Sequence, residues 1–194
     1  MVIALTGGIC CGKSTVLKAL ENFGYRIYDV DNIAHEVLNE KDIACRIKQE
    51  ISATVFCYNK IDRKKLAKIV FNDEDKRKKL NEIVHPRIIY KMLKIIEENK
   101  EKSEITFIEV PLLYELNLQK YFDKVILIYV DRLTQIERIM LRDKKTKKEA
   151  INILNTQIDI EEKKKKTKYV LLNYDLDKLE TNLKSLIERI KNEY

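Results

Sequence analysis

The sequence predicts an α/β fold with a doubly wound parallel sheet, because short apolar runs alternate with segments of helical periodicity. Five runs are expected to form strands, at residues 2–5, 25–28, 105–110, 124–130 and 169–172. The first, third and fourth of these runs are nearly continuous in hydrophobic residues, which is typical of parallel strands covered on both faces. We therefore expect a five-stranded sheet with helices on both sides.

The expected helices follow from apolar residues spaced three and four apart. Residues 13–23 form the first, which ends at Gly24, and an amphipathic helix from about residue 176 closes the chain. Between about residues 41 and 100 strand signals nearly vanish, so we expect a helical insertion on the substrate side. There Asp62 and Asp73 are predicted helix caps, and Pro86 is expected to kink or restart its helix.

Size and composition favour a single domain at residues 1–194. Its core is expected at about 1–40, 101–143 and 167–194, with the insertion at about 41–100 and a lid at about 144–166. Hydrophobic residues make up 45% and charged residues 36%, which excludes a disordered or membrane-embedded chain. The longest apolar run is too short to span a bilayer and no signal-peptide pattern is seen, so we expect a cytoplasmic protein without a membrane partner.

Charge and cysteine content narrow the possible partners. The net charge of +7 would suit nucleic acid or a polyphosphate substrate equally well. Much of the excess lies in lysine clusters on expected helices, where a solvated face is the usual explanation, and we expect no nucleic-acid partner. The four cysteines form no C-x-x-C pair, which disfavours zinc or a disulfide framework.

A phosphate-binding loop follows the first strand. Gly7, Gly12, Lys13 and Ser14 satisfy the pattern G-x-x-x-x-G-K-[ST] between an expected strand and an expected helix. Three of the four glycines of the chain lie in this loop, where glycine lets backbone N–H groups turn toward an anion. Lys13 would reach the β- and γ-phosphates, and the Ser14 hydroxyl would ligate Mg²⁺.

Carboxylates at strand ends are the candidates for handling the phosphoryl acceptor. Asp29 and Asp31 follow the second strand, and either of them could instead cap the next helix. His35 lies four residues after Asp31 and would steady it, touch substrate or simply lie at the surface. Glu109 ends the third strand, where a carboxylate could hold Mg²⁺ through water.

Two arginines precede the expected lid. Arg138 and Arg142 are four apart, so both guanidinium groups can face one direction, toward transferring phosphates or a stacked adenine. The charged helical pair at residues 145–166 has little apparent core character. It suits a mobile lid, although a solvated surface hairpin fits the composition nearly as well.

Several stretches resemble the dephospho-coenzyme A kinase family, from Ile3 nearly to Leu179. The loop from Thr6 to Ser14 resembles the family's T-G-G-I-x-x-G-K-S pattern, and Asp29-Val30-Asp31 matches its D-A-D element with Val for Ala. Further similar stretches are Arg63-x-x-Leu66-x-x-x-Val70-Phe71, Val84-His85-Pro86-Arg87-Ile88, Glu109-Val110-Pro111-Leu112-Leu113-Tyr114-Glu115, and Arg138, Arg142-Asp143, Gln157 and Asn173.

This resemblance implies a P-loop NTPase-type kinase that uses ATP and Mg²⁺ to phosphorylate the ribose 3′-hydroxyl of dephospho-CoA. The implied catalytic residues are Asp31, as the acceptor-orienting base, and Lys13, Arg138 and Arg142. Lys13 and one of the two arginines would stabilise the transferring phosphoryl group, and the resemblance does not say which arginine. The implied nucleotide-binding residues are Gly8, Ile9, Cys10, Cys11, Gly12, Lys13, Ser14, Thr15 and Asn173, and Ser14 and Glu109 are the metal candidates. The implied substrate contacts are Thr6, Asp31, His35, Arg63, His85, Pro111 and Leu112.

Two other classes stay open on the sequence alone. Another small-molecule or nucleoside monophosphate kinase would share the loop, although the His85-Pro86 and Pro111-Leu112-Leu113 elements speak against it. A nucleotide-dependent switch or nucleic-acid-binding protein would fit the charge and would bind nucleic acid with a steep salt dependence. For the oligomeric state we expect a monomer or a weak homo-oligomer.

The chain departs from the family pattern at the loop and at the adenine side. Cys10 stands where Gly is common, Cys11 replaces another small residue, and Tyr174-Asp175 replaces a glycine turn. The arginine often found shortly before Gln157 is missing. A thiol at a helix N-terminus is expected to have a lowered pKa, which would make Cys10 or Cys11 reactive. Buried small hydrophobes are the alternative.

Overall fold

The computed structural model describes residues 1–57 and 60–193, and its contacts divide the chain into two compact units. The first unit contains residues 1–28 and 98–194, and the second contains residues 29–97. The bounds of the helical insertion stay a prediction, while the second unit begins at Asp29, before the start expected for the insertion at about residue 41. The reason is that the apolar face of the helix Val30–Leu38, with Ile33 and Val37, is buried in the same cluster as Ile43 and Ile47.

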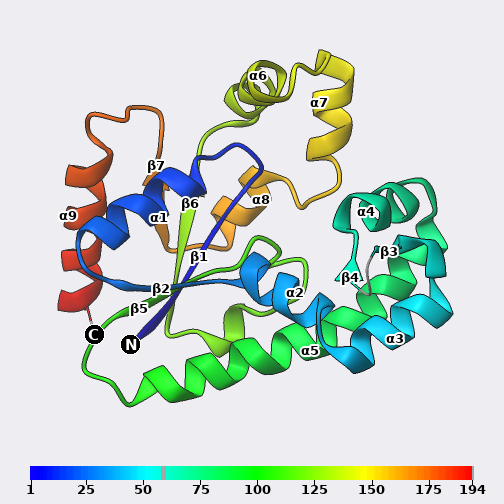
Figure 1. The fold of residues 1–194 in the computed structure, drawn as a ribbon. Coiled ribbons are helices and arrows are strands. Elements are labelled where there is room, and N and C mark those ends of the chain that lie inside the picture. Colours follow the sequence, from blue (N-terminus) through cyan, green and yellow to red (C-terminus); the bar gives the residue numbers. More distant parts are fainter. Residues whose placement is uncertain (58–59, 194) are drawn as a thin grey trace. The chain divides into compact units, whose positions relative to one another are not determined.

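A five-stranded sheet with strand order β2-β5-β1-β6-β7 forms the centre of the first unit (Figure 1). Its strands are β1 Val2–Gly7, β2 Arg26–Asp29, β5 Thr106–Glu109, β6 Lys124–Tyr129 and β7 Tyr169–Leu172. The pairs β1–β5, β1–β6 and β6–β7 are parallel. Every residue of β1 is buried, as expected for a central strand covered on both faces. The predicted α/β class with a five-stranded sheet of parallel strands is confirmed.

Helices α1 (Lys13–Asn22) and α9 (Leu179–Asn192) lie side by side and pack on the sheet (Figure 1). The inward residues of α9 are those that its periodicity predicts: Leu179, Leu183, Leu186, Ile187 and Ile190. The remaining helices of this unit are the short η2 (Gln119–Tyr121) and α6 (Arg132–Asp143), α7 (Lys147–Leu154) and α8 (Ile160–Lys165).

The segment expected to have little core character is buried at several points, and this expectation is wrong for α8. Ile160 of α8 belongs to the main core of the unit, and Lys163 is 0% exposed. The Lys163 ammonium lies 2.8 Å from Oε1 of Glu115. This ion pair is what allows a lysine from a charged run to be buried. Helix α7 has its own small cluster, in which Ala150 and Leu154 pack with Ile136 and Ile139 of α6.

The second unit is mainly helical. Its elements are α2 (Val30–Leu38), α3 (Lys41–Glu50), η1 (Ala53–Val55), β3 (Phe56–Cys57), β4 (Lys60–Ile61), α4 (Arg63–Asn72) and most of α5 (Glu74–Lys100). The antiparallel pair β3–β4 was not predicted, because two-residue strands carry almost no periodicity. A cluster around Val37, Ile47, Val55 and Ile83 forms the core of this unit.

Helix ends in this unit follow the predicted caps, but Pro86 does not end a helix. Asp62 accepts hydrogen bonds from the backbone N–H groups of Lys64 and Lys65, and Asp73 accepts one from Lys76. Helix α5 runs through Pro86 without a break. The proline ring is exposed while Ile83 and Val84 are buried, so packing of the apolar face maintains the helix where one backbone donor is missing.

In the described part of the chain, no helix combines the length and the apolar character needed to cross a membrane.

Replacing Lys163 by Met should lower the free energy of unfolding by about 3–5 kcal/mol, because Glu115 would keep a buried charge without its cation. Urea titration followed by circular dichroism measures this loss. The control is Lys165→Met on the same helix, whose side chain is 71% exposed and which should leave the midpoint unchanged. Equal midpoints for the two variants would contradict a structural role for the buried pair.

Candidate nucleotide-binding site

The loop between β1 and α1 turns sharply at two residues with positive φ. Gly12 has φ 85° and Cys10 has φ 60°, the left-handed region that L side chains rarely adopt. Gly12 also has no room for a side chain, because a Cβ there would lie 2.1 Å from Nδ2 of Asn173. Within the loop, the Cys11 N–H donates to the Gly8 carbonyl at 3.3 Å.

Three successive carbonyls of the loop accept hydrogen bonds from side chains of α6 and the end of β7. Gln135 Nε2 donates to the Ile9 carbonyl at 2.7 Å. Arg138 Nη1 donates to the Cys10 carbonyl at 3.3 Å, and Asn173 Nδ2 donates to the Cys11 carbonyl at 2.8 Å. These donors are far from the loop in sequence but form a continuous support along one side of it. We call Gln135, Arg138 and Asn173 the carbonyl clamp.

The sequence analysis missed Gln135. Its only signal is a three-residue spacing from Arg138, which places the two side chains on the same face of α6. The helix that carries them begins at an Asp131 cap, whose carboxylate accepts from the Thr134 N–H at 3.0 Å and from the Thr134 hydroxyl at 2.8 Å. These bonds lower the pKa of Asp131 to about 2.

Lys13 begins α1, and its side chain folds back onto the loop. Its Nζ donates to the carbonyls of Gly7 at 3.3 Å and Gly8 at 3.2 Å. Ser14 and Thr15 are exposed in the first turn of the helix. The ammonium group, the exposed hydroxyls and the N-terminus of α1 all favour an anion at the loop.

Thr6 and Glu109 lie at the carboxyl ends of neighbouring strands. Thr6 is 0% exposed, so it offers no surface to a substrate in this conformation, and its contact stays a prediction. Glu109 ends β5, where the register pairs it with Leu5 of β1, and it is 8% exposed. Among the described residues no group of three His, Cys, Asp or Glu side chains could hold a metal. The predicted metal ligands, the Ser14 hydroxyl and the Glu109 carboxylate, are nevertheless a fitting donor set for Mg²⁺, which usually takes its other ligands from phosphates and water.

The two arginines expected to act together have different partners. Arg138 Nη2 donates to the Asn173 carbonyl at 2.8 Å, in addition to its bond to the loop. Arg142 is 60% exposed and donates to both carboxylate oxygens of Asp143, at 2.8 and 2.9 Å. Arg138 therefore holds structure together, and Arg142 is the more accessible of the two cations.

Asn173 and Tyr174, the residues expected on the adenine side, make hydrogen bonds to the loop and to the start of α6. Asn173 is 1% exposed, with its side chain turned to the loop and its N–H donating to the Tyr129 carbonyl at 3.0 Å. Tyr174, which replaces a family glycine, is 48% exposed, and its hydroxyl accepts from the Asp131 N–H at 2.9 Å.

In the second unit, cap geometry distinguishes the two aspartates. Asp29 is the cap of α2, because its carboxylate accepts from the Asp31 N–H at 2.7 Å. Asp31 lies in the first turn with an exposed side chain. His35 is also exposed. The structure therefore identifies Asp29 as the residue that caps α2, and the role of Asp31 stays a prediction.

The remaining predicted substrate residues of this unit lie on α4 and α5. Arg63 is the first residue of α4 and is exposed. His85 is half-buried, and burial lowers the pKa of its imidazole. The neighbouring Arg87 donates to Glu40 at 2.6 Å, and Lys91 lies 2.8 Å from the same carboxylate. These bonds, that of Lys91 first, lower the pKa of Glu40.

The segment after β5 is fixed by its last two residues. Pro111 and Leu112 are half-buried. Tyr114 and Thr167 share a hydroxyl hydrogen bond of 2.6 Å, and Glu115 accepts from the Ile158 N–H at 3.0 Å besides pairing with Lys163. Tyr114 and Glu115 therefore connect the segment after β5 to α8 and its flanking residues.

The predicted lowering of the thiol pKa at Cys10 or Cys11 is wrong, because the pKa of both thiols is raised. Burial raises the pKa of the Cys10 thiol, and the positive charges of Arg142, Lys13 and Arg138 only partly oppose the rise. Cys11 is 1% exposed, and burial raises its pKa too. Burial is the largest influence on both thiols, so neither pKa is lowered as the sequence predicted.

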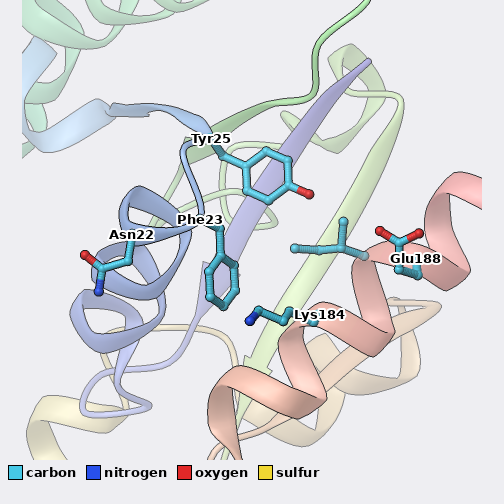
Figure 2. Close-up of a pocket in the computed structure, with 6 residues that line it drawn as sticks. Asn22, Phe23, Tyr25, Lys184 and Glu188 are labelled. Atoms are coloured by element: carbon cyan, nitrogen blue, oxygen red, sulfur yellow. The ribbon is translucent and has the colours of Figure 1, made fainter.

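A cavity of about 380 Å³ lies at the opposite end of α1 from the loop. Its lining residues come from the end of α1, the segment before β2, and α9 (Figure 2): Asn22, Phe23, Tyr25, Lys184, Ile187 and Glu188. None of the predicted site residues is among them.

At pH 7, a disulfide reagent should modify Cys45 and Cys57 quickly, because both side chains are exposed. Cys10 should react slowly and speed up as the pH rises toward its raised pKa, since the thiolate is the nucleophile. Cys11 should react only after unfolding. Absorbance of the released reagent with peptide mass mapping assigns each step, and rapid modification of Cys10 or Cys11 at pH 7 would contradict the buried-thiol account.

Comparison with known proteins identifies the family. The family model described as dephospho-CoA kinase matches residues 1–178. The chain is 37% identical to a dephospho-CoA kinase of Fusobacterium nucleatum, over 98% of this chain and 95% of that protein. It is 40% identical to one of Helicobacter pylori, over 95% and 97% of the two chains. A solved dephospho-CoA kinase from Campylobacter jejuni has a TM-score of 0.80 and 32% identity, covering 100% of this chain and 98% of that one. The chain therefore belongs to the dephospho-CoA kinase family.

Proposed function

We propose that this chain transfers the γ-phosphoryl group of ATP to the ribose 3′-hydroxyl of dephospho-CoA, which gives CoA and ADP in the last step of coenzyme A synthesis. The observation that carries the proposal is the loop between β1 and α1, with Lys13 and the first turn of α1 at its mouth. The family match supports the acceptor. The alternative of a nucleic-acid-binding switch has no comparable support.

The nucleotide is proposed to bind along the loop from Gly8 to Thr15. Backbone N–H groups and the positive end of α1 would hold its phosphates. Lys13 would exchange its bonds to the Gly7 and Gly8 carbonyls for phosphate oxygens. Arg142 is exposed and would stabilise the transferring phosphoryl group. Arg138 and Asn173 would act indirectly, by holding the Cys10 and Cys11 carbonyls of the loop.

Ser14 and Glu109 are proposed to hold Mg²⁺, the first directly and the second through water. When bound, the ion would neutralise part of the negative charge on the phosphate oxygens. Of the lid expected at residues 144–166, the part before α8 is proposed to move, because Ile160 and Lys163 of α8 are buried. A capping box between Thr146 and Glu149 fixes the start of α7 in this part.

Asp31 is proposed to accept a hydrogen bond from the 3′-hydroxyl. As the hydroxyl oxygen bonds to the γ-phosphorus and the bond to the ADP oxygen breaks, the hydroxyl proton passes to the Asp31 carboxylate. His35, Arg63, His85, Pro111 and Leu112 are the proposed contacts of the remaining substrate. Because its pKa is lowered, His85 would be neutral at pH 7 and would contact the substrate without a charge.

Replacing Asp31 by Asn should lower kcat by about 10²- to 10⁴-fold, because the amide cannot accept the proton. The matched control is Asp29→Asn, two residues away, which should change kcat no more than a few-fold, since Asn caps helices about as well as Asp. A coupled ADP-release assay measures both. Wild-type turnover by the Asp31 variant would remove the assignment of the base.

The same assay tests the acceptor. Dephospho-CoA should support turnover, whereas AMP, shikimate and gluconate should not. Turnover with AMP or shikimate and none with dephospho-CoA would contradict the proposed function.

A further inference from the structure

We propose that Gln135 is a positioning residue of the phosphate-binding loop, which acts with Arg138 and Asn173 to set the loop's peptide groups before a nucleotide binds. The inference deepens the proposed function, on which it rests, by assigning a role in triphosphate binding to a residue outside the loop motif.

The clamp fixes the direction of three peptide groups in the loop. A trans peptide is planar, with its C=O and N–H on opposite sides, so a carbonyl held on one side sends the next N–H to the other. The clamp holds the carbonyls of Ile9, Cys10 and Cys11 at 2.7, 3.3 and 2.8 Å. Each of the next N–H groups, those of residues 10–12, therefore points to the side opposite its clamped carbonyl. That of Cys11 closes the turn onto Gly8, and those of Cys10 and Gly12 would be available to a phosphate.

The clamp also holds the backbone conformation of Cys10. This residue has φ 60°, which is unfavourable for any side chain with a Cβ. The carbonyls on both sides of its Cα accept hydrogen bonds, from Gln135 before it and from Arg138 after it. The clamp therefore stabilises a conformation that the sequence at this position does not favour.

The Gln135 amide also accounts for the glycine at position 8. A Cβ at this position would lie 2.2 Å from Nε2 of Gln135, so the amide occupies the space that a side chain would need. Gln135 is itself 3% exposed. Its backbone N–H donates to the Asp131 carbonyl at 3.0 Å in the first turn of α6. A buried amide on a capped helix is a rigid support, which is what positioning requires.

Loss of the Gln135 bond should appear as weaker triphosphate binding. Without the bond from Gln135, the peptide after Ile9 could rotate, so only a fraction of the molecules would have the loop in the conformation that binds phosphate. The apparent affinity falls in proportion to that fraction. One buried hydrogen bond corresponds to a loss of about 5- to 10-fold in affinity. The loss of affinity should be the same for ATP and for inorganic tripolyphosphate, because the phosphates of both would bind the N–H groups of the loop.

The experiment compares wild type with Gln135→Met, which keeps the length of the side chain and removes the donor. Calorimetric titration should give Kd values for ATP and tripolyphosphate about 5- to 10-fold higher, while KM for dephospho-CoA stays within about twofold. The control is Glu137→Met on the exposed face of α6, which should leave both Kd values unchanged. The melting temperature of Gln135→Met should stay within a few degrees of wild type.

A second variant tests the same contact from the loop. Gly8→Ala should displace the Gln135 amide, so it should also weaken tripolyphosphate binding, and adding Gln135→Met to it should cause little further loss. If Gln135→Met does not fold, Gly8→Ala alone decides the proposal, and wild-type tripolyphosphate affinity in that variant would overturn it.

Three results would overturn the proposal: unchanged Kd values in folded Gln135→Met, a loss for ATP without a loss for tripolyphosphate, and an equal rise in KM for dephospho-CoA. The second would place Gln135 on the adenine side, and the third would make its role generally structural. These binding measurements need no turnover. A wild-type chain that binds tripolyphosphate but does not phosphorylate dephospho-CoA would end the proposed function and leave the clamp intact.

Discussion

The attachment of three loop carbonyls to α6 and the end of β7 links the loop between β1 and α1 to remote parts of the chain, and the proposed nucleotide site depends on it. Cys11 anchors the loop in the main core, and the carbonyls of Ile9, Cys10 and Cys11 are held by Gln135, Arg138 and Asn173. These side chains are placed by other features in turn. The Asp131 cap fixes the start of α6, and the bond from the Asn173 N–H to the Tyr129 carbonyl fixes the end of β7. An anion cradle made of backbone is therefore held by side chains from remote parts of the sequence.

The fold and the loop were predictable because their signals are local. Continuous apolar runs identify β1, β5 and β6, and the glycine pattern predicts the turn between β1 and α1, where an anion is expected to bind. Caps such as Asp62 are also local, since the carboxylate bonds residues two and three positions ahead. Each of these features needs only neighbours along the chain.

The features that could not be predicted depend on residues that are distant in the sequence or on the exact boundaries of an element. Lys163 looks solvated within a lysine run until Glu115 is known to lie 2.8 Å away. Gln135 has no visible role until Ile9 is placed beside it. The choice between Asp29 and Asp31 depended on where α2 begins within one residue, which is finer than periodicity resolves. For the cysteines, a helix N-terminus and burial act in opposite directions, and only the buried environment shows which is larger.

The account's central claim is that the loop is formed before the nucleotide arrives. Crystal structures of the protein without nucleotide and with bound ATP test it most directly. The account predicts that the Ile9, Cys10 and Cys11 carbonyls point at the same clamp donors in both, with loop Cα displacements below about 1 Å. Loop carbonyls that leave Gln135 and Asn173 in the nucleotide-free crystal, and return to them only with ATP, would contradict it.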